Sequence, residues 1–320
     1  MSDQRDIPEA DLSKLRTIRV QTRPNKVRAQ EFARAPRRGA SFADFVDSLP
    51  DILKAADFRA VVDAIVEAAT AKRAVVAMIG GHVTKTGLGP VLIDLMERGV
   101  VTHVATNGST VIHDYEMARF GGTSEDVEAG LGDGTFGMAE ETGREMNDAA
   151  RAGMQHGWGL GEALARALEG RADLAHAELS MLLAARRLGV GFTVHAAIGA
   201  EITHQHPAAD GAAIGATSHT DFRRLAAALV NLEGGVVLNI GSAVIMPEVF
   251  LKALTVCRNL NGGTPRAFVA ADFDMVRHYR PRMNVVQRPT RTGGGRGYEI
   301  TGHHEIMVPL LAWAVAERLG

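Results

Sequence analysis

The 320-residue chain is 46% hydrophobic and 22% charged, with a formal net charge of −2 and a sequence pI near 6.6. This composition allows a large buried core and disfavours a nucleic-acid or anionic-membrane partner, which leaves a small molecule as the expected partner. No apolar run is long enough to span a bilayer, residues 1–36 lack a secretory signal, and Cys257 has no disulfide partner, so we expect a soluble, cytoplasmic protein.

Residues 1–40 mix acidic and basic side chains with little apolar periodicity, which predicts an irregular N-terminal arm. In an oligomer such an arm often lies on a neighbouring subunit. Residues 41–320 alternate helical and strand patterns, so we expect a single α/β domain with a doubly wound, mostly parallel sheet. Ser41 caps the first expected helix of this domain, and residues 58–71 form the second.

Two consecutive strand, loop and helix units carry most of the functional signal. The first strand covers residues 74–79 and is followed by the loop 82–87, whereas the second covers residues 100–105 and leads into the loop 106–110. In a parallel sheet both loops lie beyond the carboxyl ends of the strands, where a nucleotide is expected. Neither the dinucleotide fingerprint nor the phosphate-binding P-loop matches the sequence, and the glycines alternatively serve only as tight turns.

The later elements repeat the alternation of strands and helices. Their order is helices from Met138 to about Ala152, Gly161 to Leu168 and Leu174 to Leu188; a strand at 192–194; a polar loop from His195 to His219; a helix around Phe222 to Val230; a strand at 236–240; a helix from Pro247; a strand at 266–271; an arginine-rich segment at 272–296; and a closing helix from Pro309. The loop from His195 to His219 is long enough to suggest a functional role.

Histidines and acids in the expected loops are the candidate catalytic residues. His113 with Asp114 and Glu116 can act as acid and base near the second loop, although acids in a first helical turn also simply complement the helix dipole. The other candidates are His204, His206, His304 and Glu305. Alternatively His195, His204 and His206 hold a divalent metal ion.

The arginine-rich segment offers a second polar cluster. Arg280, Arg282, Arg288, Arg291 and Arg296 either clamp an anionic group or form an ordinary solvated surface. The neighbouring glycines 293–295 favour a substrate-facing loop.

The order of these features resembles the deoxyhypusine synthase family. The resemblance rests on the segments IGGHVTKTG, ATNGSTVIHDYE and VVLNIGSAV and on the closing MVPLLAWAVAERL, which together span residues 74–319. It implies an NAD-binding parallel α/β fold of Rossmann-like type, assembled as a homotetramer with active sites between subunits. It also implies oxidation of an amine or amino-acid-like substrate at a C–N bond. The implied NAD contacts are Gly81, His82, Lys85, Thr86, Asn107, Gly108, Gly241 and Ser242.

One departure limits the reaction that this resemblance implies. The family forms an imine on a lysine shortly before its last helix, where this sequence reads GGGRGYEITGHHE, and the only lysine after Lys85 is Lys252. We therefore expect a deoxyhypusine synthase-like transferase or oxidoreductase that does not perform the complete deoxyhypusine synthase reaction. The alternatives are a metal-dependent hydrolase or lyase on the same scaffold and a non-catalytic nucleotide-sensing protein.

Overall fold

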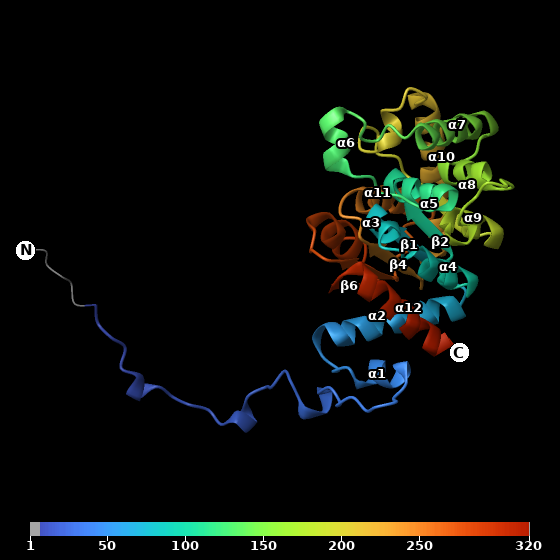
Figure 1. Cartoon of the computed structure of the whole chain (residues 1–320). Helices are drawn as coiled ribbons and strands as arrows, with labels where there is room; N and C mark the ends of the chain where they lie inside the picture. The colour runs from blue at the N-terminus through green and yellow to red at the C-terminus, as the bar shows by residue number, and fades with distance from the viewer. Residues whose placement is uncertain (1–6, 320) are drawn as a thin grey trace, which may run out of the picture.

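The computed structural model describes residues 7–319, and a six-stranded sheet forms the centre of the molecule (Figure 1). The strands are β1 Val75–Ile79, β2 His103–Thr106, β3 Gly191–Val194, β4 Val236–Ile240, β5 Val269–Asp274 and β6 Arg296–Thr301. Their order is β3-β2-β1-β4-β5-β6, and every neighbouring pair is parallel. The expected doubly wound parallel sheet is thus confirmed.

Helices cover both faces of this sheet. They are α1 Phe42–Ser48, α2 Leu53–Thr70, α3 Gly81–Lys85, α4 Gly89–Glu97, α5 Gly108–Phe120, α6 Val127–Asp133, α7 Glu140–His156, α8 Leu160–Leu168, α9 Met181–Leu188, α10 Gly211–Ala228, α11 Ile245–Leu260 and α12 His304–Leu319. All five residues of β1 and of β4 are buried, so neither of these strands alternates polar and apolar side chains.

Successive residues of β1 contribute to different apolar clusters. Val75, Ala77 and Ile79 pack with α2, α4 and α12, whereas Val76 and Met78 pack with α10 and α11. A third cluster joins α5, α7 and α8 beside β3. Because the strand order reverses between β1 and β4, their carboxyl ends border the crevice where ligands bind in open α/β sheets.

The structure corrects three expectations about the loops. Residues 81–85, expected mainly as loop, form α3. The expected loop from His195 to His219 ends earlier, because the Asp210 carboxylate accepts the N–H groups of Ala212 and Ala213 and caps α10. Residues 296–301 form β6, a strand that the sequence pattern did not indicate, since four of its six residues are polar or glycine.

The position of β6 removes the expected substrate-facing loop. Glycines 293–295 precede β6 and therefore lie at the amino edge of the parallel sheet, opposite the carboxyl ends of β1 and β2. Arg291 and Arg296 belong to the same edge. Arg280 pairs with Glu248, and Arg288 donates to Asn284. The arginines thus do not form one anion clamp.

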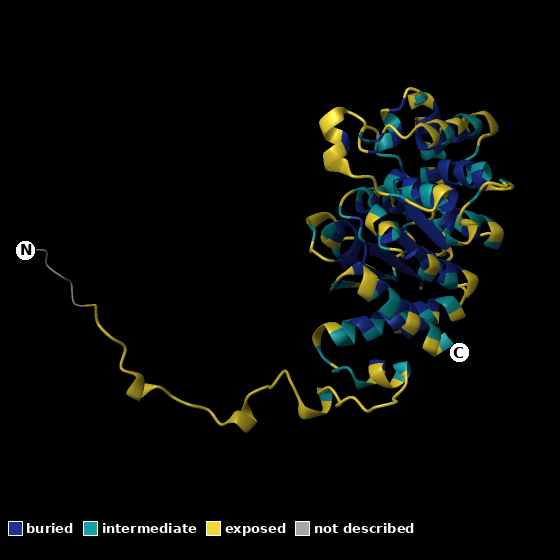
Figure 2. Ribbon diagram, in the orientation of Figure 1, coloured by how far each residue is buried: buried dark blue, intermediate teal, exposed yellow. Residues whose placement is uncertain are grey.

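Residues 7–30 run away from this body as an extended segment (Figure 1), and all of them are exposed (Figure 2). Between residues 7 and 319, no helix is both long enough and apolar enough to cross a membrane.

Candidate active site

The turns after β1 and β2 bring α3 and α5 into direct contact at the carboxyl edge of the sheet. A Cβ atom added to Gly81 would lie 2.0 Å from Ser109 Oγ, and one added to Gly80 would lie 2.1 Å from the carbonyl oxygen of Gly241. Glycine is required at both positions for close packing within the chain. The turns after β1, β2 and β4 therefore form one contiguous surface.

His113 and Glu116 lie on this surface. Thr123, which follows the end of α5, contacts both of them. His113 Nδ1 is 2.7 Å from Thr123 Oγ1, and the Thr123 hydroxyl donates to Glu116 Oε2. Since this hydroxyl uses its proton on Glu116, its oxygen accepts from His113 Nδ1–H. His113 is thereby held in the tautomer whose Nε2 is free to accept a proton. Thr142 donates to the other oxygen of Glu116, at 2.9 Å.

A cavity of about 180 Å³ opens beside this hydrogen-bonded chain. Its polar lining comes from Lys85, Ser109, His113, Glu116, Ser124, Glu125 and Glu201. Burial, together with the positive charge of Lys85, lowers the pKa of His113 to about 4. A neutral histidine with a free Nε2 can act as a general base near neutral pH.

Glu201 also lines the cavity and is a candidate site residue that the sequence analysis missed. Its carboxylate accepts from the backbone N–H groups of Gly108, at 2.9 Å, and Ala197, at 3.0 Å, and lies 3.1 Å from His204 Nε2. The residue is 8% exposed. Glu201 thus occupies the N-terminus of α5, where the helix dipole and free N–H groups favour an anion. The sequence feature that could have indicated Glu201 is the presence of an acidic residue within the long polar loop from His195 to His219.

The crevice between β1 and β4 holds two more of the expected residues. The ring of His304 lies 5.5 Å from the ring of His82, and a Cβ atom on Gly241 would lie 2.8 Å from it. His304 Nε2 is 3.3 Å from the carbonyl oxygen of Phe273, and burial lowers the pKa of His304.

Several buried polar atoms along this edge lack a hydrogen-bond partner among the residues that the structure describes. They are Thr84 Oγ1, Asn107 Oδ1, Thr110 Oγ1 and His304 Nδ1. Buried polar atoms are normally paired, so these four suit a polar ligand. By contrast, Thr86 Oγ1 donates to the carbonyl oxygen of His82, and Ser242 Oγ accepts from Met246 N–H.

The remaining candidate residues do not join the cavity. Asp114 lies on another side of α5 and caps α9, accepting from Ser180 Oγ and from the N–H groups of Met181 and Leu182. Burial raises the pKa of Asp114 to about 6 against these bonds. Glu305 is exposed and lies 3.6 Å from His303. The geometry gives Asp114 a capping role rather than the expected acid–base role.

The three histidines of the alternative metal site point to different partners. His195 pairs with Thr193, His204 with Glu201 and His206 with Glu140. Across residues 7–319, no group of three His, Cys, Asp or Glu side chains is arranged to hold a metal ion. These histidines therefore do not form the metal site that their spacing suggested.

Comparison with known proteins gives matches in structure only. No model of a known protein family matches the sequence, and neither does any curated protein. A candidate deoxyhypusine synthase from Entamoeba histolytica matches with a TM-score of 0.50 and 10% identity, covering 88% of this chain and 94% of that one. A candidate LOR/SDH protein from Methanococcus maripaludis S2 has a TM-score of 0.50 and 13% identity, covering 84% of this chain and 71% of that one.

A third match is AgrE, solved as a variant with L-arginine bound. It has a TM-score of 0.50 and 14% identity, and the match covers 82% of this chain but 33% of AgrE, so the chain spans about a third of that protein. At such identities these matches establish the fold alone. The resemblance seen in the sequence is confirmed at that level: the chain has the deoxyhypusine synthase-like fold.

Proposed function

We propose that this protein is an NAD-dependent enzyme that oxidises a small amine or amino-acid-like substrate at a C–N bond. The observation that carries the proposal is the chain from His113 through Thr123 to Glu116 beside a cavity at the carboxyl edge of the sheet. Oxidation of an amine to an imine releases a hydride and a proton. His113 Nε2 is the base that takes the proton, and Glu116, acting through Thr123, stabilises the charge that His113 then carries.

The charges around the cavity support an amine substrate. Glu116, Glu125 and Glu201 line it together with one lysine, Lys85, and His113 is neutral. Three carboxylates against one ammonium group favour a cationic ligand. Lys85 can in addition pair with a carboxylate on the substrate, which suits an amino-acid-like molecule.

The crevice residues fit NAD in part. The fold, the reversal of strand order beside the crevice and the unpaired Asn107 Oδ1 and His304 Nδ1 support a nucleotide with ribose and amide groups at this edge. Asn107, His82, Gly241 and His304 would hold it, and bound NAD would supply the hydride acceptor. Gly108 was expected to contact NAD, but its N–H group already donates a hydrogen bond to Glu201 Oε1. The homotetramer and the cytoplasmic location stay predictions.

Calorimetry with NAD and an absorbance assay for NADH over a panel of amines and basic amino acids test the proposal. The unmodified protein should bind NAD and reduce it with at least one amine. His113→Asn should lower kcat about 100-fold or more while NAD binding persists. Glu305→Gln is the matched control, since Glu305 is exposed outside the cavity. A folded protein without NAD affinity would rule the function out.

A further inference from the structure

The N-terminal arm, defined as residues 7–30, contains many apolar side chains that do not pack against the rest of the described chain. Its large apolar side chains are exposed, with Ile7 at 88%, Leu12 at 70% and Ile18 at 74%. Among the described residues, its hydrogen bonds and ion pairs stay within the segment 7–32. An apolar segment of this kind gains free energy only by docking against another surface.

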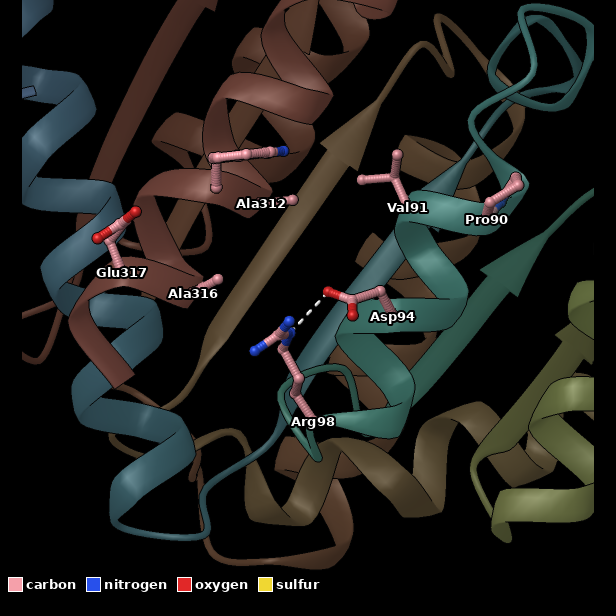
Figure 3. A pocket seen from close by; sticks show the side chains of 8 residues that line it. Pro90, Val91, Asp94, Arg98, Ala312, Ala316 and Glu317 are labelled. Carbon is pink, nitrogen blue, oxygen red and sulfur yellow. Dashed lines mark hydrogen bonds and ion pairs between the residues drawn. The ribbon is translucent and has the colours of Figure 1, made fainter. Parts of the chain in front are cut away.

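A groove lies between α4 and α12, away from the candidate active site. It measures about 600 Å³, and Pro90, Val91, Asp94 and Arg98 face Ala312, Ala316 and Glu317 across it (Figure 3). Trp313 also lines the groove and is 60% exposed. Arg98 and Asp94 neutralise each other at 2.7 Å, so the groove presents mainly apolar groups and the carboxylate of Glu317.

The arm leaves the body beside this groove. It continues into α1, where Phe42 packs against Trp313 with ring centroids 5.4 Å apart. Two copies related by a two-fold axis at this face would each place an arm next to the groove of the other, which gives a closed, self-complementary interface. An extended arm of this length reaches up to about 80 Å, whereas α12 is about 24 Å long, so the arm can cross a neighbour's groove.

Charge favours the same pairing. Residues 7–30 carry six lysines and arginines against two acids, whereas the charged residues that line the groove are the mutually neutralised pair Asp94 and Arg98 and the carboxylate of Glu317. A basic, apolar arm suits an apolar groove that carries the carboxylate of Glu317. We propose that the N-terminal arm of one copy lies in the α4–α12 groove of a second copy of this chain. This interface does not depend on the proposed enzymatic function.

Sedimentation velocity of the full chain and of a variant lacking residues 1–30 provides the first test. The full chain should sediment as a dimer or larger oligomer at micromolar concentration, and the truncated chain should associate at least tenfold more weakly. Ala316→Arg, which places a cation in the groove, should act in the same direction. Leu131→Arg is the matched control. Leu131 is 71% exposed and belongs to α6, which lies at the opposite end of the body from α12 (Figure 1). A monomeric full chain overturns the proposal.

Disulfide trapping identifies the surface that receives the arm. One preparation carries Leu12→Cys, Leu15→Cys or Ile18→Cys, and a second preparation with a different mass tag carries Ala316→Cys; the native Cys257 is 1% exposed and does not compete. Mixed and oxidised, they should form a disulfide between unlike chains. Replacing the second partner by Leu131→Cys should give at least tenfold less product. Equal yields with both partners overturn the proposal. A third preparation carries Ile18→Cys and Ala316→Cys in the same chain, and formation of the disulfide only within that chain also overturns it.

Discussion

Thr123 determines the orientation of His113, because its hydroxyl links that histidine to Glu116. Thr123→Val removes this link and leaves both ionisable groups in place. We expect kcat to fall about 10- to 100-fold, with the acidic limb of the pH–rate profile displaced, since the histidine tautomer is no longer fixed. Thr142→Val is the matched control, because Thr142 donates to Glu116 without contacting His113. Equal losses in the two variants would contradict the positioning role of Thr123.

His103 gives the folded protein a sensitivity to acid that can be measured. Burial lowers the pKa of His103 to about 4, whereas an unfolded chain protonates histidine near pH 6.5. The unfolded state therefore binds more protons as the pH falls from 6.5 towards 4, and the folded state loses stability in that window. Compared with His103→Gln, the unmodified protein should lose about 2 kcal/mol between pH 7.5 and pH 5, measured by urea unfolding. A difference independent of pH would refute this assignment.

At the scale of elements, Glu201 joins the 195–210 loop to the N-terminus of α5. A Cβ atom on Gly108 would lie 2.1 Å from Glu201 Oε2, so Gly108→Ala should displace this carboxylate and leave buried N–H groups unpaired. We expect a loss of about 1–3 kcal/mol in the free energy of unfolding. Faster hydrogen exchange in the loop should accompany that loss. Urea unfolding and hydrogen exchange of the two proteins measure these effects.

Gly132→Ala in α6 is the control for this change. An added Cβ atom there meets nothing within 4 Å, and Gly132 lies inside a helix. The substitution should leave stability unchanged or raise it by about 0.5–1 kcal/mol. If Gly108→Ala behaves like Gly132→Ala, the Glu201 carboxylate does not hold α5.

At the scale of the whole molecule, we predict from the distribution of lysine that the protein does not use an imine-forming mechanism of the deoxyhypusine synthase type. Lys252 lies on α11 in an ion pair with Glu248, and the region before α12 has no lysine. Lys85 lines the cavity but is exposed, whereas nucleophilic lysines are usually desolvated. Incubation with spermidine and NAD followed by borohydride should leave the mass of the intact chain unchanged. An aminobutyl adduct on either lysine would show that the complete transfer chemistry is possible.

The sequence determined the main elements of the sheet and part of the site. The apolar run of β1, the run of β4 that is apolar except at Asn239, and the apolar stripe of α4 carry a local signal, because burial of a strand or of one helix face restricts the residue types found there. Parallel strand order then places the turns after β1 and β2 at one edge, so the sequence indicated the edge of the sheet at which His113, Glu116 and Lys85 line the cavity, whereas their roles stay predictions. β6 was missed because its exposed polar residues leave no such signal.

Only the tertiary structure decided which polar groups act together. His113 and Glu116 share a face of α5 through their i, i+3 spacing, whereas Asp114 faces α9. Neither the spacing nor the residue types predict that Ser180 donates a hydrogen bond to Asp114. Thr123 and Glu201 reach the site from a segment after α5 and from a loop nearly a hundred residues later. Their contacts depend on how α5, α7 and the 195–210 loop pack together. This packing is determined by the whole core, so no local sequence pattern predicts it.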